Sequence, residues 1–362
     1  MSSLMQDMGA RAVRLGIPLR VQLDLTYRCN ERCVHCYLDH DDHGELTLAE
    51  ISSLLDQLAG AGVFFLTVSG GEIFLRRDLF DILAHARRLL FAVKIKTNAV
   101  LIRQEQARRL ADLNLDGVQI SVYSDRPEIH DGITLVPGSL ERSLAAARLL
   151  RAAGVKVTFA NVLMRQNAGD YLAVKALAEE MGAGFSVDPT ITPMMDGDRS
   201  ILALNIAQAN LAQVFHDTHV VNDVSEFCAP PEGPLDAKDA FDRIPCSAGH
   251  NSCYISPYGD VYPCVQFPLP SGNIRTTTFL DIWKGSPQLA EVRSISLADL
   301  HGCSACSNQP GCSRCPGLAY MEGNMRGPST QDCEKSYARF GVMSDNLRGR
   351  QQSGIIPLSL VP

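Results

Sequence analysis

The sequence has 362 residues, of which 46% are hydrophobic and 20% are charged, and its formal net charge is −7 at pH 7. This length predicts about two domains with a sizeable core. The negative charge provides no basic field for a phosphate backbone or an anionic lipid surface, so nucleic acid and membranes are poor candidate partners. Residues 1–19 lack the pattern of a signal peptide, and nowhere do about 18 uncharged apolar residues run together, so we expect a cytoplasmic protein.

Short apolar runs alternate with amphipathic helical patterns through the first half of the chain. The apolar runs cover residues 21–25, 63–68, 93–96, 117–122, 155–163 and 185–191, and the helical patterns cover 47–59, 78–90, 104–113, 139–153 and 170–182. This alternation predicts six βα units that form a parallel sheet with right-handed crossovers. In such folds the chemistry collects at the carboxyl ends of the strands. Periodicity alone does not separate a six-unit barrel from an open doubly wound sheet.

Three cysteines, Cys29, Cys33 and Cys36, follow the first predicted strand. No further cysteine occurs before Cys228, whereas a structural zinc or iron–sulfur site is normally closed by a fourth protein ligand. Three thiolates bind three irons of a four-iron cluster and leave the fourth iron open to a small molecule. The gap in the ligand set therefore marks a working site.

The spacing of this loop is C-x3-C-x2-C, with His35 and Tyr37 beside the third cysteine. It resembles the cluster loop of the radical S-adenosylmethionine (SAM) enzymes. The resemblance implies a fold, a partial (β/α)6 TIM-like barrel, and a cofactor, SAM bound to the open iron by its amino and carboxylate groups. It also implies that reductive cleavage of SAM gives a 5′-deoxyadenosyl radical that abstracts hydrogen, so that the cofactor supplies the chemistry.

Gly70, Gly71 and Glu72 directly follow the second predicted strand. Two glycines let the backbone pass close to a ligand, although such a triplet is also an ordinary strand-to-loop turn. One strand after the cysteine loop, it resembles the GGE motif of the radical SAM family. That motif receives the amino group of the methionine part of SAM.

Five further SAM contacts are implied by the resemblance at strand ends and on one helix. Ala99 departs from the family pattern, because it stands where a glycine usually follows the strand-three asparagine. The implied contacts are Asn98, Ser121, Arg142, Val162 and Leu163. The alternative for Asn98 and Ser121 is a capped strand end. The alternative for Arg142 is a solvated helix charge, and the alternative for the apolar pair is core packing.

The C-terminal part of the chain is rich in cysteine: nine of the 12 lie between Cys228 and Cys333, inclusive. With no export signal, metal ligation is a better use for them than disulfide bonds. Eight of the nine, in a pattern with two C-x2-C pairs, are enough to close two four-iron clusters. Structural zinc at the C-x2-C pairs is the alternative.

Residues 259–264, 272–274 and 280–283 resemble the SPASM extension of radical SAM peptide maturases, such as the pyrroloquinoline quinone and mycofactocin maturases. The resemblance implies two auxiliary clusters with interleaved ligands. The first takes Cys246, Cys253, Cys264 and Cys315, the second takes Cys303, Cys306, Cys312 and Cys333, and Cys228 is left as a buried small hydrophobe. One spacing departs from the family, because two residues rather than three separate Cys312 from Cys315.

These observations divide the chain into a lead-in at 1–19, a radical SAM barrel at 20–200, a linker at 201–240, a SPASM domain at 241–345 and a tail at 346–362. The expected cofactors are SAM and three [4Fe-4S] clusters, one that binds SAM and two that are auxiliary. A flavodoxin or a ferredoxin-type protein is the expected electron donor.

The resemblance implies an enzyme that modifies a ribosomally made precursor peptide by crosslinking, dehydrogenation or epimerisation. Sulfatase maturation is a weaker match, because Val265 stands where those members place an aspartate base. Two alternatives stay open: a radical SAM enzyme that acts on a small molecule or a tetrapyrrole side chain, and a non-catalytic iron–sulfur electron-transfer protein. Asp188, Tyr123 and Arg165 are eligible acids or bases, but the sequence assigns none of them.

Only about 20 residues precede the first predicted strand, fewer than the small peptide-recognition domain that many maturases carry there. We therefore expect a separate peptide-recognition protein as a further partner.

Overall fold

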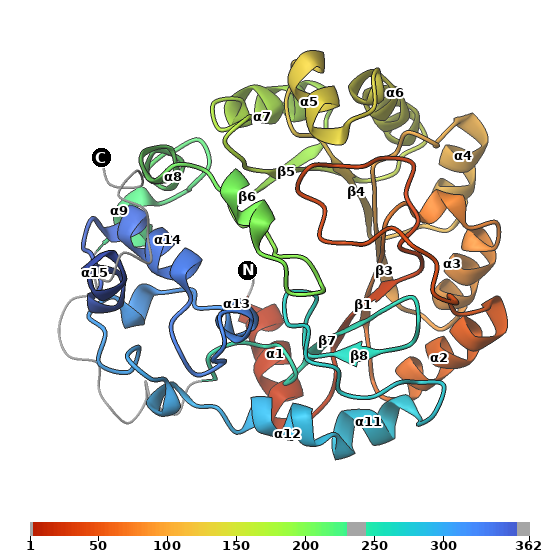
Figure 1. Cartoon of the computed structure of the whole chain (residues 1–362). Coiled ribbons are helices and arrows are strands. Elements are labelled where there is room, and N and C mark those ends of the chain that lie inside the picture. Colours follow the sequence, from red (N-terminus) through yellow and green to blue (C-terminus); the bar gives the residue numbers. More distant parts are fainter. Residues whose placement is uncertain (1–2, 230–243, 353–362) are drawn as a thin grey trace.

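The structure, a computed structural model, describes residues 3–229 and 244–352. Its centre is one eight-stranded sheet with the strand order β6-β5-β4-β3-β2-β1-β7-β8 (Figure 1). The strands are β1 (Arg20–Asp24), β2 (Phe65–Ser69), β3 (Ala92–Thr97), β4 (Gly117–Ser121), β5 (Val157–Val162), β6 (Gly184–Asp188), β7 (Ser252–Ile255) and β8 (Val261–Tyr262). The first six pair in parallel with their neighbours, and the sheet curves into an open partial barrel.

Helices follow the strands and cover the outer face of the curved sheet. Those of the barrel are α1 (Ser3–Leu15), α2 (Leu48–Gly60), η1 (Ile73–Leu75), α3 (Leu79–Arg88), α4 (Gln104–Asp112), α5 (Pro127–Thr134), α6 (Ser139–Ala152) and α7 (Tyr171–Glu180). Those that follow β6 are η2 (Ser200–Leu204), α8 (Gln208–Phe215), α9 (Val224–Phe227), α11 (Phe279–Gly285), α12 (Pro287–Arg293), η3 (Leu297–Asp299), η4 (Gln309–Gly311), α13 (Pro316–Met321), α14 (Thr330–Phe340) and α15 (Asp345–Gln352).

The six predicted strands and five predicted helices of the barrel are all present, with ends that differ by a few residues from the expected ones. The expected α/β fold with a partial (β/α)6 barrel is therefore confirmed. Helices α1 and α5 were not predicted. Helix α2 begins where the sequence signals a start, because Thr47 and Glu50 form a reciprocal capping box.

The two faces of the barrel strands carry different side chains, which fixes where the site forms. Leu23, Val68 and Ile95 are buried in the core between the sheet and the helices. Their neighbours Gln22 and Lys96 point to the opposite face, since successive side chains of a strand alternate. The inner face of the barrel is therefore polar.

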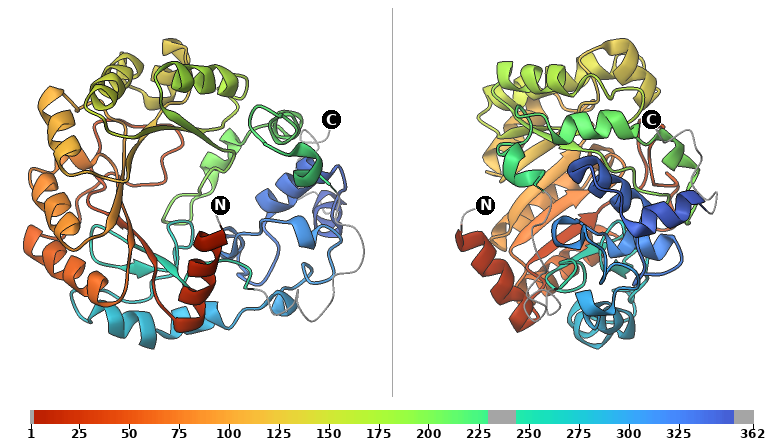
Figure 2. Two further views of the ribbon diagram at one scale, coloured as in Figure 1. Left: turned by 180° about the vertical axis from the view of Figure 1, so that it is seen from behind. Right: turned by 90° about the vertical axis from the view of Figure 1, so that its left-hand side faces the viewer.

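The C-terminal module, residues 244–352, continues the same sheet. Its strand β7 pairs in parallel with β1, with Arg20 opposite Ser252 and Leu23 opposite Ile255, and β8 turns back antiparallel to β7. The indole Nε1 of the fully buried Trp283 on α11 donates 2.7 Å to the carbonyl of Gly16, just after α1. The N-terminal helix is thus fastened to the C-terminal module (Figure 2).

The predicted linker contains ordered helices where the structure describes it. Leu211 and Val214 of α8 pack with Ala338 of α14 in one apolar cluster. Residues 230–240 of that linker and 353–362 of the predicted tail lie outside the described residues. Within the part of the chain that is described, no helix is long and apolar enough to cross a membrane.

Candidate functional site

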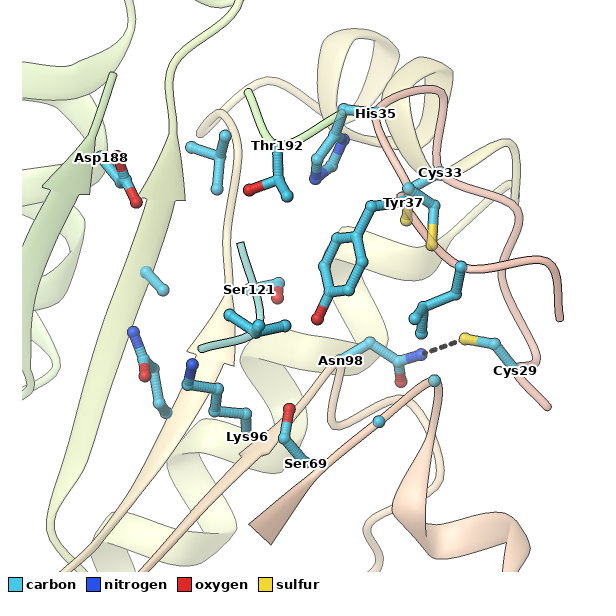
Figure 3. Close-up of a pocket in the computed structure, with 18 of the residues that line it drawn as sticks. Cys29, Cys33, His35, Tyr37, Ser69, Lys96, Asn98, Ser121, Asp188 and Thr192 are labelled. Atoms are coloured by element: carbon cyan, nitrogen blue, oxygen red, sulfur yellow. Dashed lines mark hydrogen bonds between the residues drawn. The ribbon is translucent and has the colours of Figure 1, made fainter. Parts of the chain in front are cut away.

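A cavity of about 410 Å³ opens at the carboxyl ends of the barrel strands (Figure 3). The three thiols of Cys29, Cys33 and Cys36 line one side of it, and polar side chains from the strands line its floor. This volume lies in the range of about 300–1,000 Å³ typical of small-molecule sites. The three cysteines of the sequence motif are therefore brought to a cavity that can take a ligand beside them.

The cysteine loop, residues 29–36, is held on two sides by backbone hydrogen bonds. The N–H of Gly71 donates a 2.8 Å hydrogen bond to the carbonyl of Thr26, and the N–H of Glu72 donates a 2.9 Å hydrogen bond to the carbonyl of Arg28. On the other side the N–H of Val34 donates 2.9 Å to the carbonyl of Ile133 in α5. Helix α5 thus has a clear role, which is to support this loop.

The glycines of the Gly-Gly-Glu triplet are required by the close passage of this loop. Gly70 has a φ of +135°, and a Cβ built on it would lie 2.2 Å from the carbonyl oxygen of Thr26. A Cβ on Gly71 would lie 2.4 Å from the carbonyl oxygen of Arg28. Both glycines also line the cavity, so a ligand can approach their backbone.

Glu72 lies behind the cavity wall. Its fully buried carboxylate accepts hydrogen bonds from Thr97 Oγ1 at 2.7 and 2.8 Å, from the N–H of Asn98 at 2.9 Å and from the N–H of Phe74 at 3.0 Å. Burial raises the pKa of this carboxyl, and these hydrogen bonds oppose the rise. The carboxylate thereby ties the end of β2 to the end of β3.

The other predicted SAM contacts divide into two groups. Asn98, Ser121 and Val162 line the cavity, and the Asn98 amide also reaches Cys29 Sγ at 3.8 Å. Leu163 is fully buried in the apolar cluster beside α8, and Arg142 donates 3.0 Å to the carbonyl of Pro137. The structure does not bring these last two to the cavity.

Ala99, which follows Asn98, adopts the left-handed conformation with a φ of +64°. The family's usual glycine fits such a backbone without strain, whereas a Cβ there costs about 1–2 kcal/mol. Ala99 is also completely buried, so its methyl group offsets part of that cost by about 0.8 kcal/mol. The departure from the family pattern is therefore tolerated.

Of the three eligible acids or bases, Asp188 and Tyr123 line the cavity. Tyr123 is buried and stands edge-on to the ring of His35, with 4.9 Å between the ring centroids. Arg165 is directed elsewhere, because its Nε donates 3.0 Å to the carbonyl of Asn205.

Several cavity residues were missed from the sequence, among them Gln22, Lys96 and Gln119 on the strand floor. The ammonium of Lys96 donates 3.2 Å to Gln22 Oε1. Their signal was present in the alternation of polar and apolar side chains along β1, along residues 93–96 of β3 and along β4. It could have been used once the core face of the sheet was assigned.

Asp24, at the end of β1, forms a buried network beneath the cavity floor. Its two oxygens accept hydrogen bonds of 3.1 Å from Gln22 Nε2 and from the hydroxyl of Tyr254, which lies 2.6 Å from the hydroxyl of Tyr27. Burial raises the pKa of Asp24 to about 6, against the hydrogen bond from Gln22 and the charge of Lys96.

The C-terminal module supplies one wall of the cavity through Val265 and Gln266. Gln266 Nε2 donates 2.9 Å to Thr192 Oγ1 in the segment that follows β6. Two residues of α14 hold the same segment: Lys335 Nζ donates 2.7 Å to Thr190 Oγ1, and Gln331 Nε2 donates 3.2 Å to the carbonyl of Ile191. The module therefore closes the open side of the barrel.

Cys264 lies within electrostatic reach of the three other thiols assigned to the first auxiliary cluster. Burial is the largest cause that raises the pKa of Cys253, Cys264 and Cys315. Beyond burial, Cys264 raises the pKa of Cys253, and Cys246 raises those of Cys264 and Cys315. The short spacing before Cys315 therefore does not separate it from the set.

The four thiols assigned to the second auxiliary cluster, Cys303, Cys306, Cys312 and Cys333, line a separate cavity of about 50 Å³. Among the described residues, no group of three or more His, Cys, Asp or Glu side chains is arranged to hold a single metal ion. In a four-iron cluster each thiolate binds a different iron, so the thiols surround a space. This donor set fits such a cluster.

Cys228 belongs to neither set. It is half-buried rather than buried as predicted, and its Sγ donates 3.3 Å to the carbonyl of Phe215. Residues 39–43, a stretch of aspartates and histidines, are exposed except for His40, and His43 contacts Asp39 at 2.9 Å.

Comparison with known proteins identifies two domains in the chain. Residues 23–178 match the family model of the radical SAM superfamily, and residues 246–316 match that of SPASM, an iron–sulfur cluster-binding domain. The chain is 27% identical to the AdoMet-dependent heme synthase of Methanosarcina barkeri over 84% of this chain and 92% of that protein. It is 28% identical to the mycofactocin maturase MftC of Mycobacterium tuberculosis over 96% of this chain and 93% of that protein.

Among solved structures, SuiB of Streptococcus suis bound to its precursor peptide SuiA has the same fold, with a TM-score of 0.71 at 18% identity over 91% of this chain and 80% of SuiB. Both parts of the fold, the barrel with its cysteine loop and the C-terminal module with its eight thiols, thus have matching families. The chain is therefore a radical SAM enzyme with a C-terminal SPASM domain.

Proposed function

We propose that this enzyme modifies a ribosomally made precursor peptide, by crosslinking, dehydrogenation or epimerisation. One observation carries the proposal: the cavity beside Cys29, Cys33 and Cys36 has a wall built from Val265 and Gln266 of the C-terminal module. The part of the chain that distinguishes SPASM enzymes therefore reaches the place where a substrate would lie. One relative is named as a mycofactocin maturase, and SuiB has been solved with its precursor peptide SuiA bound.

We assign SAM binding to the residues that line the cavity next to the cysteine loop, namely Gly70, Gly71, Asn98, Ser121 and Val162. When bound, the cluster and SAM supply a 5′-deoxyadenosyl radical that abstracts hydrogen from the substrate. Glu72 acts behind them by fixing the backbone of Asn98. The eight remaining cluster ligands would hold two auxiliary clusters in the two sets given above, for three four-iron clusters in all.

Two further partners belong to the proposal. A flavodoxin or a ferredoxin-type protein would supply the electron, and a separate recognition protein would deliver the precursor. The need for a recognition protein is supported by the position of helix α1. This helix packs against the C-terminal module, where its Gly9 carbonyl accepts a 3.1 Å hydrogen bond from Asn251 Nδ2.

A second candidate function is the modification of a tetrapyrrole side chain, which the similarity to the AdoMet-dependent heme synthase favours. A comparison of the two substrates distinguishes these two functions. The anaerobically reconstituted enzyme is incubated with SAM, reductant and either a short peptide encoded beside its gene or a porphyrin substrate, and 5′-deoxyadenosine is measured. The proposal predicts that the peptide stimulates its formation and the porphyrin does not; stimulation by the porphyrin alone would establish the second candidate.

A further inference from the structure

The cavity of the second auxiliary cluster is lined by more than its four thiols. Arg314, from the short segment between Cys312 and Cys315, and Ser336, from α14, also face it. Both residues are buried, with exposed fractions of 8% and 5%. A cation and a hydroxyl therefore line the same small cavity as four cysteines.

The guanidinium of Arg314 is only partly satisfied by the protein. Its Nε donates 2.9 Å and its Nη2 donates 2.6 Å to the carbonyl of Gly327, and Nη2 also bonds the carbonyl of Met325. These bonds fix the plane of the guanidinium. Its Nη1 is buried and has no hydrogen-bond partner among the described residues. Buried donors are almost always paired in folded proteins, so this one calls for an acceptor.

Ser336, on a different element, also carries a buried donor without a partner in the described part of the chain. It lies one helical turn after Cys333 on α14, and the donor is its Oγ. Two unpaired donors from separate elements thus occur in residues that line the same thiol-lined cavity. The sulfurs of an iron–sulfur cluster are acceptors that would pair with both.

The charges around the cavity agree with this arrangement. The guanidinium of Arg314 carries a positive charge and lines the same cavity as the thiols of Cys303 and Cys312. Arg314 therefore favours negative charge on the sulfurs that face it.

We propose that Arg314 and Ser336 donate hydrogen bonds to the sulfurs of the second auxiliary cluster and raise its reduction potential, an inference that rests on the proposed three-cluster assignment. Reduction adds an electron to a cluster that is already anionic. A buried cation and a hydroxyl donor stabilise the reduced form more than the oxidised one, and hydrogen bonds to sulfur and local charge are known determinants of cluster potentials.

The test is a potentiometric titration followed by electron paramagnetic resonance. It uses the full chain with Cys29, Cys33 and Cys36 changed to Ala, so that only the auxiliary clusters remain. In this background we expect Arg314→Gln to shift the reduction equilibrium of one cluster about tenfold toward the oxidised form, or about 59 mV lower for one electron. Arg314→Lys and Ser336→Ala should give smaller shifts of the same cluster, and the other cluster should keep its potential.

Arg326→Gln is the matched control. It removes an arginine of the same module whose Nη1 pairs at 3.1 Å with the half-exposed Glu291, away from the cavity, and should leave both potentials unchanged. Wild-type potentials in all three test variants with full iron content would overturn the proposal, as would loss of four irons in both arginine variants, which would make the role structural. About four rather than eight irons in the unmutated background would refute the three-cluster assignment itself.

Discussion

At the scale of single residues, the absence of a side chain at Gly71 is as important as the thiols it supports. In Gly71→Ala the new Cβ cannot stay 2.4 Å from the carbonyl oxygen of Arg28, so the cysteine loop must move. We expect the reconstituted protein to lose about four of about twelve irons and to form 5′-deoxyadenosine at least about tenfold more slowly. Gly60→Ala, at the open end of α2 with no atom within 4 Å of the new methyl, should retain both. Equal iron content in the two variants would refute this account of the loop.

Asp24 predicts a pH dependence with a definite sign. Its pKa is raised by burial from 3.8 to about 6, so the folded protein holds a proton that the unfolded chain has already released. The contribution of this group to stability is therefore largest at low pH and is lost as the pH rises from about 4 to about 6, by at most about 1.4 kcal/mol per pH unit.

Asp24→Asn should remove this dependence, because a neutral amide can still bond Gln22 and Tyr254. Thermal midpoints of the two proteins, measured anaerobically between pH 5 and 6.5, give the comparison. We expect the wild-type midpoint to fall relative to that of the variant as the pH rises. Parallel profiles would contradict the assignment.

The roles of single residues were only partly predictable. The spacing of three cysteines was sufficient to predict the cysteine loop, because that spacing is unusual outside one kind of site. It could not reveal that Glu72 would be engaged by Thr97 and Asn98, since the contacts of a buried carboxylate depend on strands that are distant in sequence. For the same reason Arg142 and Leu163 were expected at the cavity and lie elsewhere.

At the scale of elements, the barrel was predictable because each of its strands and helices has a clear period of its own. The pairing of β7 with β1 was not, because Ser252–Ile255 is a four-residue run that contains a cysteine and joins a strand more than 200 residues away. Helix α5 was missed because it has only eight residues, begins at Pro127 and contains Gly132, a poor helix former.

The start of α13 offers a test at this scale. A Cβ on Gly317 would lie 2.1 Å from the carbonyl oxygen of Gln266, so Gly317→Ala forces the helix away from the segment after Cys264. Because Cys315 is the N-cap of this helix, we expect the first auxiliary cluster alone to lose its iron, about four per chain. Iron and sulfide analysis with electron paramagnetic resonance of the remaining clusters would measure this.

Gly285→Ala, at the end of α11 in the same module, has no atom within 4 Å of the new methyl and is the control. If Gly317→Ala kept full iron, the proposed ligand set that joins Cys315 to Cys264 would be wrong.

At the scale of the whole molecule, the C-terminal module completes the barrel rather than standing beside it. Three of its side chains, Gln266, Gln331 and Lys335, hold the segment 190–192 that forms the remaining wall of the cavity. Lys335→Ala removes one of these bonds, worth about 1 kcal/mol, and we expect hydrogen exchange of that segment to quicken about five- to tenfold. Lys284→Ala, at an exposed position of α11, should leave exchange unchanged. Equal protection in both variants would mean that the module does not support this wall.

The measurement that tests the central claim most directly is the accurate mass of the candidate precursor peptide. The peptide is incubated anaerobically in deuterated water with reduced enzyme, SAM and a recognition protein, and Cys29→Ala enzyme serves as the control. The account predicts loss of two hydrogens, or gain of one solvent deuterium by epimerisation, in step with 5′-deoxyadenosine and only with intact Cys29. An unaltered peptide despite steady cleavage of SAM would contradict it.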